Sequence, residues 1–253
     1  MKRHLLTWVN DVLGTCSAVL MGDCPTPPPE PKPKYGPPHV VLWLLLCCFT
    51  LSAAAQEVPR GIFFGTTPVK ARYNDVLDIF GDKMALYDPE DNMLILQDGF
   101  NYRLPEGFVT FNTGAPLRIR LAGRVYMEAA VVSKDPVVIE STTYSTLTIV
   151  SNGSATALKC PRLVIDDYFT SVRLYSDAPN MEMIALKCPG EVVVNGGALR
   201  MEVSRSPKAA EINTLTLNGS VMETPSEITV NEYGVICDHK GRYARLVSIV
   251  PEP

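Results

Sequence analysis

Two stretches of sequence decide the fold: ALKCPRLVIDD at residues 157–167 and ALKCPGEVVVNG at residues 185–196. The same five residues, ALKCP, open both stretches, and each time an apolar run and a turn follow them. Weaker copies in the same phase are AAEINTLTLNG at residues 209–219 and GVICD at residues 234–238. Unequal repeats of this size are typical of solenoid proteins. The register of the copies predicts one column that holds Cys160, Cys188, Ile212 and Cys237.

Each repeat divides into three short strands. The first is LVI, VVV or LTL in successive copies, the second is SVRLY at residues 171–175 or ALRMEV at residues 198–203, and the third carries ALKC. Asp, Asn and Gly tolerate the left-handed backbone conformation and cap their own turns. Such residues recur between the first and second strands, as Asp166-Asp167, Asn195-Gly196 and Asn218-Gly219.

Short apolar or alternating runs rich in Val, Ile, Leu and Thr continue towards the N-terminus, whereas helix-period patterns are almost absent. One coil of three strands cannot bury its inward side chains alone, but coils stacked about 4.8 Å apart pair every backbone edge. We therefore predict an all-β protein, a right-handed three-sided parallel β-solenoid with an N-terminal hairpin cap. We expect about six coils between Leu94 and Ile249. Cys160, Cys188 and Cys237 should form an interior ladder of reduced thiols rather than disulfides.

The chain divides into four parts. Residues 1–39 form a proline-rich extension, either a long cytoplasmic tail or a stretch ahead of a later start. Residues 40–55 are too few for the roughly 20 apolar residues that span a bilayer, and they end in an A-x-A pattern. They predict a signal segment cleaved after Ala55, with an uncleaved membrane anchor as the alternative. Residues 56–92 are a linker and cap containing the hairpin turn YDPEDN, and residues 93–250 are the solenoid.

Composition narrows the function. The formal net charge of −4 argues against nucleic-acid binding, because no basic patch is available to release counterions. Histidine occurs only at His4, His39 and His239, and two of these precede the predicted cleavage site. One remaining histidine cannot build a multi-histidine metal site. We expect no metal, no cofactor and no catalytic residues.

Three motifs in order carry a family resemblance: YDPEDNMLILQDG at 87–99, PLRIRLAG at 116–123 and STLTIVSNGSATALKC at 145–160. They resemble exported bacterial parallel β-helix repeat proteins of the gut Bacteroidales type, in which a YDP hairpin precedes LxIxLxG and LTIxGxGxL strands and glycine-rich coils. The resemblance covers about Tyr87 to Asn218 and implies a carbohydrate-binding or polysaccharide-lyase-like surface module. The chain departs from the pattern where Asp166-Asp167 replaces the usual Gly-Gly, so no ligand site is carried over from the family.

The recurring lysines are the first candidates for binding. Lys159 and Lys187 hold the same position in two copies and should stack on the outside. Together with Arg162, Arg173 and Arg200 they could bind an anionic glycan, although a solvated face is the simpler interpretation.

An acidic pair is the second candidate. Asp166 and Asp167 could bind calcium or serve acid–base chemistry on a polysaccharide. Adjacent side chains of a strand point to opposite faces, which favours a turn instead. A cluster of aromatic residues is interpreted as cap core, with a sugar-stacking platform as the alternative: Tyr73, Tyr87, Phe100, Tyr102 and Phe108.

These observations predict a non-catalytic exported surface protein that binds a polysaccharide or host glycan through one face of the solenoid. It should be secreted or held at the cell surface, with no nucleic-acid partner and no membrane span after cleavage. The alternative is a polysaccharide lyase or hydrolase acting on an acidic glycan. The ligand-binding candidates are Lys159, Lys187, Arg173, Arg200, Asp166 and Asp167.

Overall fold

The computed structural model describes residues 61–69, 76–152, 156–177 and 184–253. The proline-rich extension and the signal segment expected within residues 1–55 lie outside the described residues. Within the described part of the chain, no helix has the length and apolar character needed to cross a membrane. The described residues form strands joined by turns and short loops, so the all-β prediction is confirmed.

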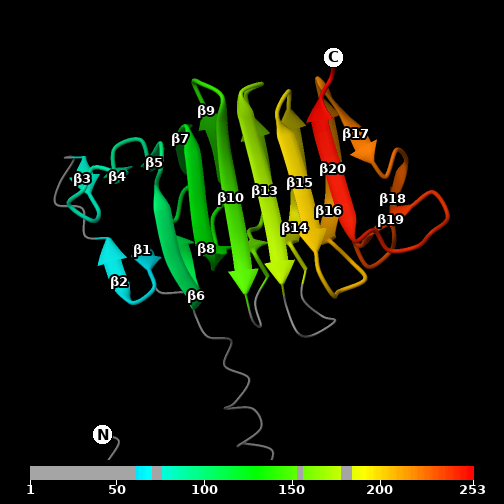
Figure 1. Cartoon of the computed structure of the whole chain (residues 1–253), viewed down its shortest axis with the longest axis horizontal. Helices are drawn as coiled ribbons and strands as arrows, with labels where there is room; N and C mark the ends of the chain where they lie inside the picture. The colour runs from blue at the N-terminus through cyan, green and yellow to red at the C-terminus, as the bar shows by residue number, and fades with distance from the viewer. Residues whose placement is uncertain (1–60, 70–75, 153–155, 178–183) are drawn as a thin grey trace, which may run out of the picture. The chain divides into compact units, whose positions relative to one another are not determined.

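Twenty strands follow one another along the described residues, and Figure 1 labels most of them in chain order. They are β1 (Gly61–Phe64), β2 (Thr67–Val69), β3 (Leu77–Asp78), β4 (Ala85–Asp88), β5 (Met93–Gln97), β6 (Asn101–Asn112), β7 (Leu117–Ala122), β8 (Arg124–Ser133), β9 (Val137–Ser141), β10 (Ser145–Asn152), β11 (Leu158–Lys159), β12 (Leu163–Asp166), β13 (Thr170–Asp177), β14 (Leu186–Asn195), β15 (Ala198–Val203), β16 (Ala210–Asn218), β17 (Ser220–Thr224), β18 (Ile228–Val230), β19 (Ile236–Asp238) and β20 (Leu246–Pro251).

The strands wind into a β-solenoid of about five turns, and each turn contributes to three parallel sheets. We call these sheets faces A, B and C. Face A stacks β5, β7, β9 and β12 with the ends of β14 and β16. Face B stacks the starts of β6 and β8 with β10, β13 and β15, the last three of which lie side by side in Figure 1. Face C stacks the ends of β6 and β8 with β11 and the starts of β14 and β16. The predicted parallel β-solenoid is therefore confirmed.

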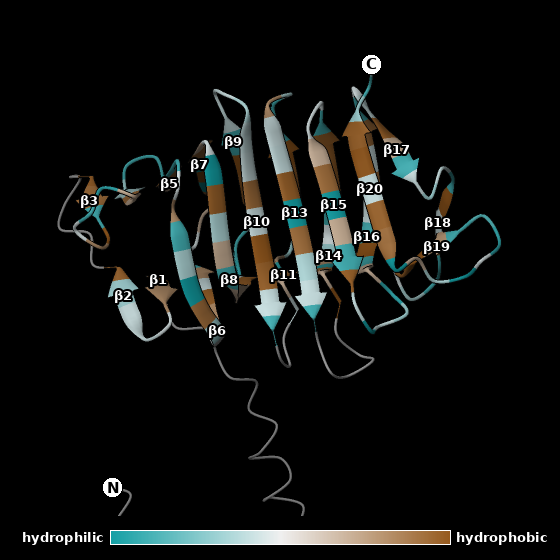
Figure 2. Ribbon diagram, in the orientation of Figure 1, coloured by the Kyte–Doolittle hydropathy of each residue, from teal (hydrophilic) through white to brown (hydrophobic). Residues whose placement is uncertain are grey.

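The core lies inside the coils, because every second side chain of a strand points inward. Apolar and polar colours alternate along β10, β13 and β15 in Figure 2. Inward apolar residues stack on one another from coil to coil, and two such fully buried columns are Leu147, Val172 and Leu199, and Ile139, Ile165 and Val194. Burial of each such aliphatic side chain contributes about 1.5–3 kcal/mol.

The two ALKC copies stack as the repeat predicts. Leu158 is the register partner of Leu186, and the Cys160 N–H donates to the carbonyl oxygen of Lys187 at 3.1 Å. Cys188 in turn lies opposite Ile212. Both cysteines are buried free thiols, and their mutual hydrogen bond together with burial raises the pKa of Cys160 well above its usual value.

Cys237 does not belong to this column, and that part of the prediction is wrong. It lies on β19, which pairs antiparallel with β18 and places Thr229 opposite Cys237. The final strand β20 is also antiparallel and lies between β15 and β17. The chain after Asn218 thus closes the end of the solenoid instead of adding a coil, which leaves about five turns where about six were expected.

The predicted turn residues build the corner between faces A and B. The Asn195 side-chain amide donates to the Asp166 carboxylate at 3.2 Å, and the Asn218 side-chain amide donates to the Asn195 side-chain oxygen at 2.9 Å. The residue after each of these has a positive φ, 95° at Asp167 and 73° at Gly196. The side-chain ladder therefore holds successive corners in the left-handed conformation that the turn requires.

The first coil is covered by the hairpin cap that the sequence predicts. Strands β4 and β5 pair antiparallel around the YDPEDN turn. The Tyr87 hydroxyl donates to the Asn92 side-chain oxygen at 2.8 Å, and the Asn92 amide donates to the carbonyl oxygens of Ala115 and Pro116. The turn is thereby tied to the start of the next coil, and β1 covers β6 in a second antiparallel pairing.

Substitutions at two adjacent residues of β13 can test which side chains point into the coil and which point outward. Leu174 is 1% exposed, so Leu174→Ala should lower the free energy of unfolding by about 2–5 kcal/mol. Arg173 is exposed on the outside, so Arg173→Ala should change it by less than about 0.5 kcal/mol. Urea unfolding of both variants is the measurement. Equal losses would contradict the assigned orientation of β13.

Candidate functional site

The structure separates the six residues predicted to bind a ligand into three pairs on different sides of the coil. The pairs are Lys159 and Lys187 on face C, Arg173 and Arg200 on face B, and Asp166 and Asp167 at the corner between faces A and B. Arg162, also considered for binding, forms an ion pair with Glu191 of the next coil at 2.9 Å. The six residues therefore do not form one site.

The lysines stack as expected, but one of them is neutralised. Lys159 and Lys187 are register partners on the outside of face C. Glu211 of the next coil forms ion pairs with Lys187 at 2.8 Å and with Lys208 at 2.6 Å. Burial works to raise the pKa of Glu211, but the hydrogen bonds and charges of the two lysines outweigh it and hold the pKa below its usual value. A single carboxylate thus serves two lysines on face C, and among the described residues Lys159 beside Lys187 forms no ion pair.

The aspartates serve the corner. Asp166 accepts the hydrogen bond from Asn195 described above. The Asp167 carboxylate accepts a hydrogen bond from the backbone N–H of Phe169 at 3.2 Å. The two side chains hold different parts of the same turn, which agrees with the turn interpretation rather than with an acidic pair directed at a ligand.

Face B carries a groove on its outside. Two adjoining hollows of about 520 and 430 Å³ share Thr148 and Arg173, and we call them together the face B groove. Tyr126 lines one hollow, whereas Tyr175 and Arg200 line the other. One row of the groove consists of register partners in successive coils: Asn101, Tyr126, Thr148, Arg173 and Arg200. The groove therefore runs across the strands, from coil to coil.

Positive charge dominates this row. Arg200 forms an ion pair with Glu202 at 2.8 Å. In the part of the chain that the structure describes, no carboxylate lies within ion-pair distance of Arg173, nor of Arg124 at the end of the groove. These two guanidinium groups present planar forks of donors that match the geometry of a carboxylate.

The carboxylates of face B lie further along the strands and contact neighbouring side chains. Glu128 accepts a hydrogen bond from the Asn152 amide at 2.7 Å. Asp177 accepts one from the Ser204 hydroxyl at 2.5 Å. These two carboxylates follow the arginine row along their strands and lie towards face C, while Asp166 and Asp167 lie at the opposite corner, with face A.

Sequence reasoning found Arg173 and Arg200 but missed other residues of the groove. Arg124, Tyr126 and Thr148 line the groove, but the repeat did not identify them because their register partners in neighbouring coils are different residue types. The alternating pattern of their strands was the available signal, since it fixes which side chains point outward. The core interpretation is right for Phe100, which is 4% exposed, and wrong for Phe108, which is 46% exposed, while Tyr73 lies outside the described residues.

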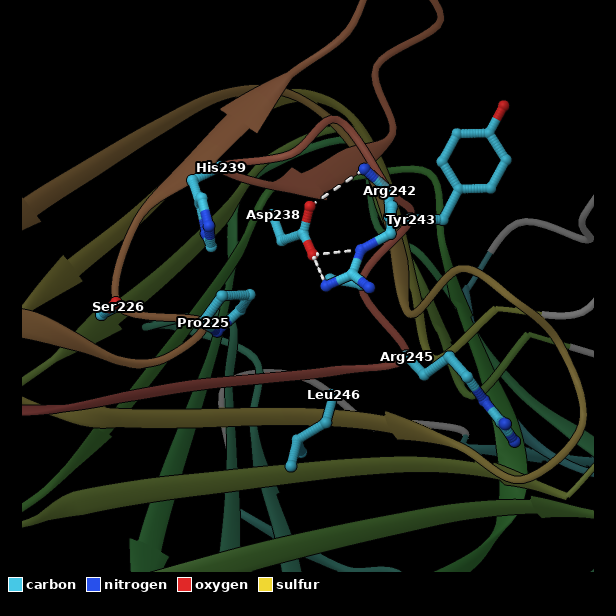
Figure 3. Close-up of a pocket in the computed structure, with 9 residues that line it drawn as sticks. Pro225, Ser226, Asp238, His239, Arg242, Tyr243, Arg245 and Leu246 are labelled. Carbon is cyan, nitrogen blue, oxygen red and sulfur yellow. Dashed lines mark hydrogen bonds and ion pairs between the residues drawn. The ribbon is translucent and has the colours of Figure 1, made fainter.

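A separate hollow of about 530 Å³ lies in the C-terminal cap (Figure 3). The Asp238 carboxylate accepts hydrogen bonds from the Arg242 backbone N–H at 3.0 Å and from its guanidinium at 2.9 Å. In Figure 3, Tyr243 and Arg245 are directed away from this pair. The Asp238–Arg242 pair therefore closes its own turn, and the face B groove is the stronger candidate for binding.

The described residues were also considered as ligands for a metal ion. Among the described residues, no group of three or more His, Cys, Asp or Glu side chains is placed to hold a metal ion. Comparisons with protein-family models, with curated proteins and with solved structures found no match to this chain. The function must accordingly be argued from the groove itself.

The Asp238 turn has a defined response to acid. The hydrogen bond from the Arg242 side chain, helped by backbone N–H donors, lowers the pKa of Asp238 from 3.8 to about 2. Because the folded pKa is below the unfolded one, the stabilisation by Asp238 is complete above the unfolded pKa. It is lost as the pH falls towards 2.

We expect an NMR titration of the Asp238 carboxyl to show a midpoint near 2. Arg242→Ala should return this midpoint towards 3.8, because the largest cause of the shift is removed. A wild-type midpoint near 3.8 would show that the ion pair does not form in solution.

Proposed function

We propose that this protein is a non-catalytic, exported surface protein that binds an extended polysaccharide in the face B groove. The observation that carries the proposal is the pair of hollows that share Thr148 and Arg173, because together they make a groove that crosses several coils. A solenoid repeats its outward side chains at the strand spacing of about 4.8 Å, which suits a polymer held through several weak contacts.

The chemistry of the groove supports a carbohydrate ligand. Hydroxyl, guanidinium and phenol groups from Thr148, Arg173 and Tyr175 line it, and they can donate and accept hydrogen bonds with sugar hydroxyls. Neither Arg173 nor Arg124 forms an ion pair with a described carboxylate, and free guanidinium groups favour an anionic glycan. The Asp98 carboxylate accepts a hydrogen bond from the Arg124 backbone N–H at 2.7 Å, so Arg173 is the stronger of the two anion-binding candidates. The resemblance to carbohydrate-binding β-helix proteins of gut Bacteroidales points the same way.

A polysaccharide lyase or hydrolase acting on an acidic glycan is the alternative. Glycoside hydrolysis commonly uses two carboxyl groups that flank the bound sugar. On face B, Glu202 forms an ion pair with Arg200. Glu128 accepts a hydrogen bond from Asn152, and Asp177 accepts one from Ser204. This arrangement favours binding over turnover, and a test for product release accompanies the binding experiment below.

Removal of Arg173, which lines both hollows of the groove, should weaken glycan binding. Arg173→Ala should raise the dissociation constant for an oligogalacturonate by roughly tenfold or more, since one charge-assisted contact is lost. Arg205→Ala, which removes the same charge from an exposed loop position, should leave the dissociation constant unchanged. Isothermal titration calorimetry with the full chain measures both, and added salt should weaken the wild-type interaction.

Two results would overturn this assignment. Equal affinity of the wild-type chain and Arg173→Ala would remove the groove from consideration. Release of unsaturated or reducing ends from the oligogalacturonate by the wild-type chain would favour the enzyme instead.

Export rests on the signal segment at residues 40–55. We propose that a signal peptidase cleaves after Ala55, so the exported chain should begin at Gln56. N-terminal sequencing of the protein recovered from the surface or medium of an expressing bacterium measures this. An N-terminus before Gln56 would support the uncleaved anchor.

A further inference from the structure

An exposed aromatic pair lies beside the face B groove. Tyr144 is 83% exposed and Phe169 is 37% exposed, and both lie in turns at the corner between faces A and B. Their rings meet edge to face, with centroids 4.7 Å apart. We call these two residues the aromatic corner. The pair leaves adjoining ring surfaces exposed to water.

The register of the strands places the aromatic corner at one side of the groove. Tyr144 precedes Thr146 and Thr148 by two and four positions, and Phe169 precedes Arg173 by four. Thr146, Thr148 and Arg173 point outward from face B because side chains alternate along a strand, whereas Tyr144 and Phe169 lie in the turns that lead into β10 and β13. At about 3.3 Å per residue, four positions separate Phe169 from Arg173 by about 13 Å along the strand.

Small side chains occupy the interval between the aromatic corner and the arginine row. Thr146, Ser171 and Ala198 stand there in three successive coils and are too short to fill the space between Phe169 and Arg173. A ligand can therefore lie on these small residues with one end on the aromatic rings and the other on a guanidinium. Arg124 is the register partner of Thr146, so a second guanidinium lies diagonally beside Tyr144.

Tyr168, which precedes Phe169 in the same turn, is an aromatic residue that packs against the rest of the protein. Its ring covers Gly196 so closely that an added Cβ there would come within 2.7 Å of the ring. Its hydroxyl also donates to the backbone carbonyl oxygen of Glu252. Tyr168 is thus used in packing the corner and the C-terminal segment, whereas the ring of Tyr144 remains open to solvent.

We propose that the aromatic corner is a stacking subsite for a pyranose ring, and that the ligand of the groove is a uronic-acid polysaccharide. This inference rests on the proposed function and specifies its ligand class. The apolar C–H face of the sugar packs on the Tyr144 ring, which Phe169 contacts at an interplanar angle of 79°, while carboxylates of the same chain bind Arg124 and Arg173. An anion without an apolar ring face, such as polyphosphate, uses only the arginines.

The experiment compares two polyanions against three variants of the full chain in calcium-free buffer. The probes are an oligogalacturonate and a polyphosphate of similar charge. Tyr144→Ala should weaken oligogalacturonate binding about tenfold and leave polyphosphate binding unchanged, because only the stacking contact is removed. Arg173→Ala should weaken both. Tyr144→Phe retains the ring and should bind oligogalacturonate like the wild-type chain.

Tyr233→Ala is the matched control, since Tyr233 is 74% exposed in the C-terminal region away from face B. It should bind both probes like the wild-type chain. Thermal unfolding of Tyr144→Ala verifies that the corner still folds, and Tyr144→Phe provides a second comparison if it does not.

The outcomes separate the two proposals. Loss of oligogalacturonate binding in Arg173→Ala but not in Tyr144→Ala overturns the aromatic subsite and leaves the groove intact. Equal weakening of both probes by Tyr144→Ala also overturns stacking, because the effect is then not specific for a sugar ring. Absence of binding by the wild-type chain to any acidic or neutral polysaccharide overturns both proposals.

Discussion

The parallel stacking of one coil on the next is the interaction on which the rest of this structure depends. Backbone hydrogen bonds join most strands to partners on both sides, so each residue has a fixed neighbour in the coil before and the coil after. An inward column such as Leu147, Val172 and Leu199 is therefore closely packed. The same register places Thr148, Arg173 and Arg200 in an outward row, so core and groove follow from one constraint.

Stacking leaves an open edge at each end, and both ends are closed by reversing the chain. At the start, β4 lies antiparallel to β5, and at the finish β20 lies antiparallel between β15 and β17. Unpaired strand edges attract other strands. The caps thus limit growth of the stack to about five turns and leave the sides of the coil as the surface available for a ligand.

The sequence predicted the stacking well because identical residues must meet in a column. The ALKC repeat aligned Lys159 with Lys187 and Cys188 with Ile212 correctly. It failed for Cys237 because a short apolar run looks the same in a parallel coil and in an antiparallel hairpin. It also grouped Lys159 with Arg173, since alternation distinguishes inside from outside but does not say which of three sides a strand occupies. The aromatic corner was missed because neither of its residues recurs.

The like-charged row on face B is informative because folding does not require it. Arg173 and Arg200 are register partners, and like charges directly opposite each other destabilise a sheet. A Thr at either position would satisfy the strand equally well, as Thr148 does in the preceding coil. Glu202 offsets the charge of Arg200, but no described carboxylate does so for Arg173. The charge of Arg173 therefore stays available on the outside of face B, on the strand that follows the aromatic corner, and the proposed anionic glycan requires both groups to be accessible.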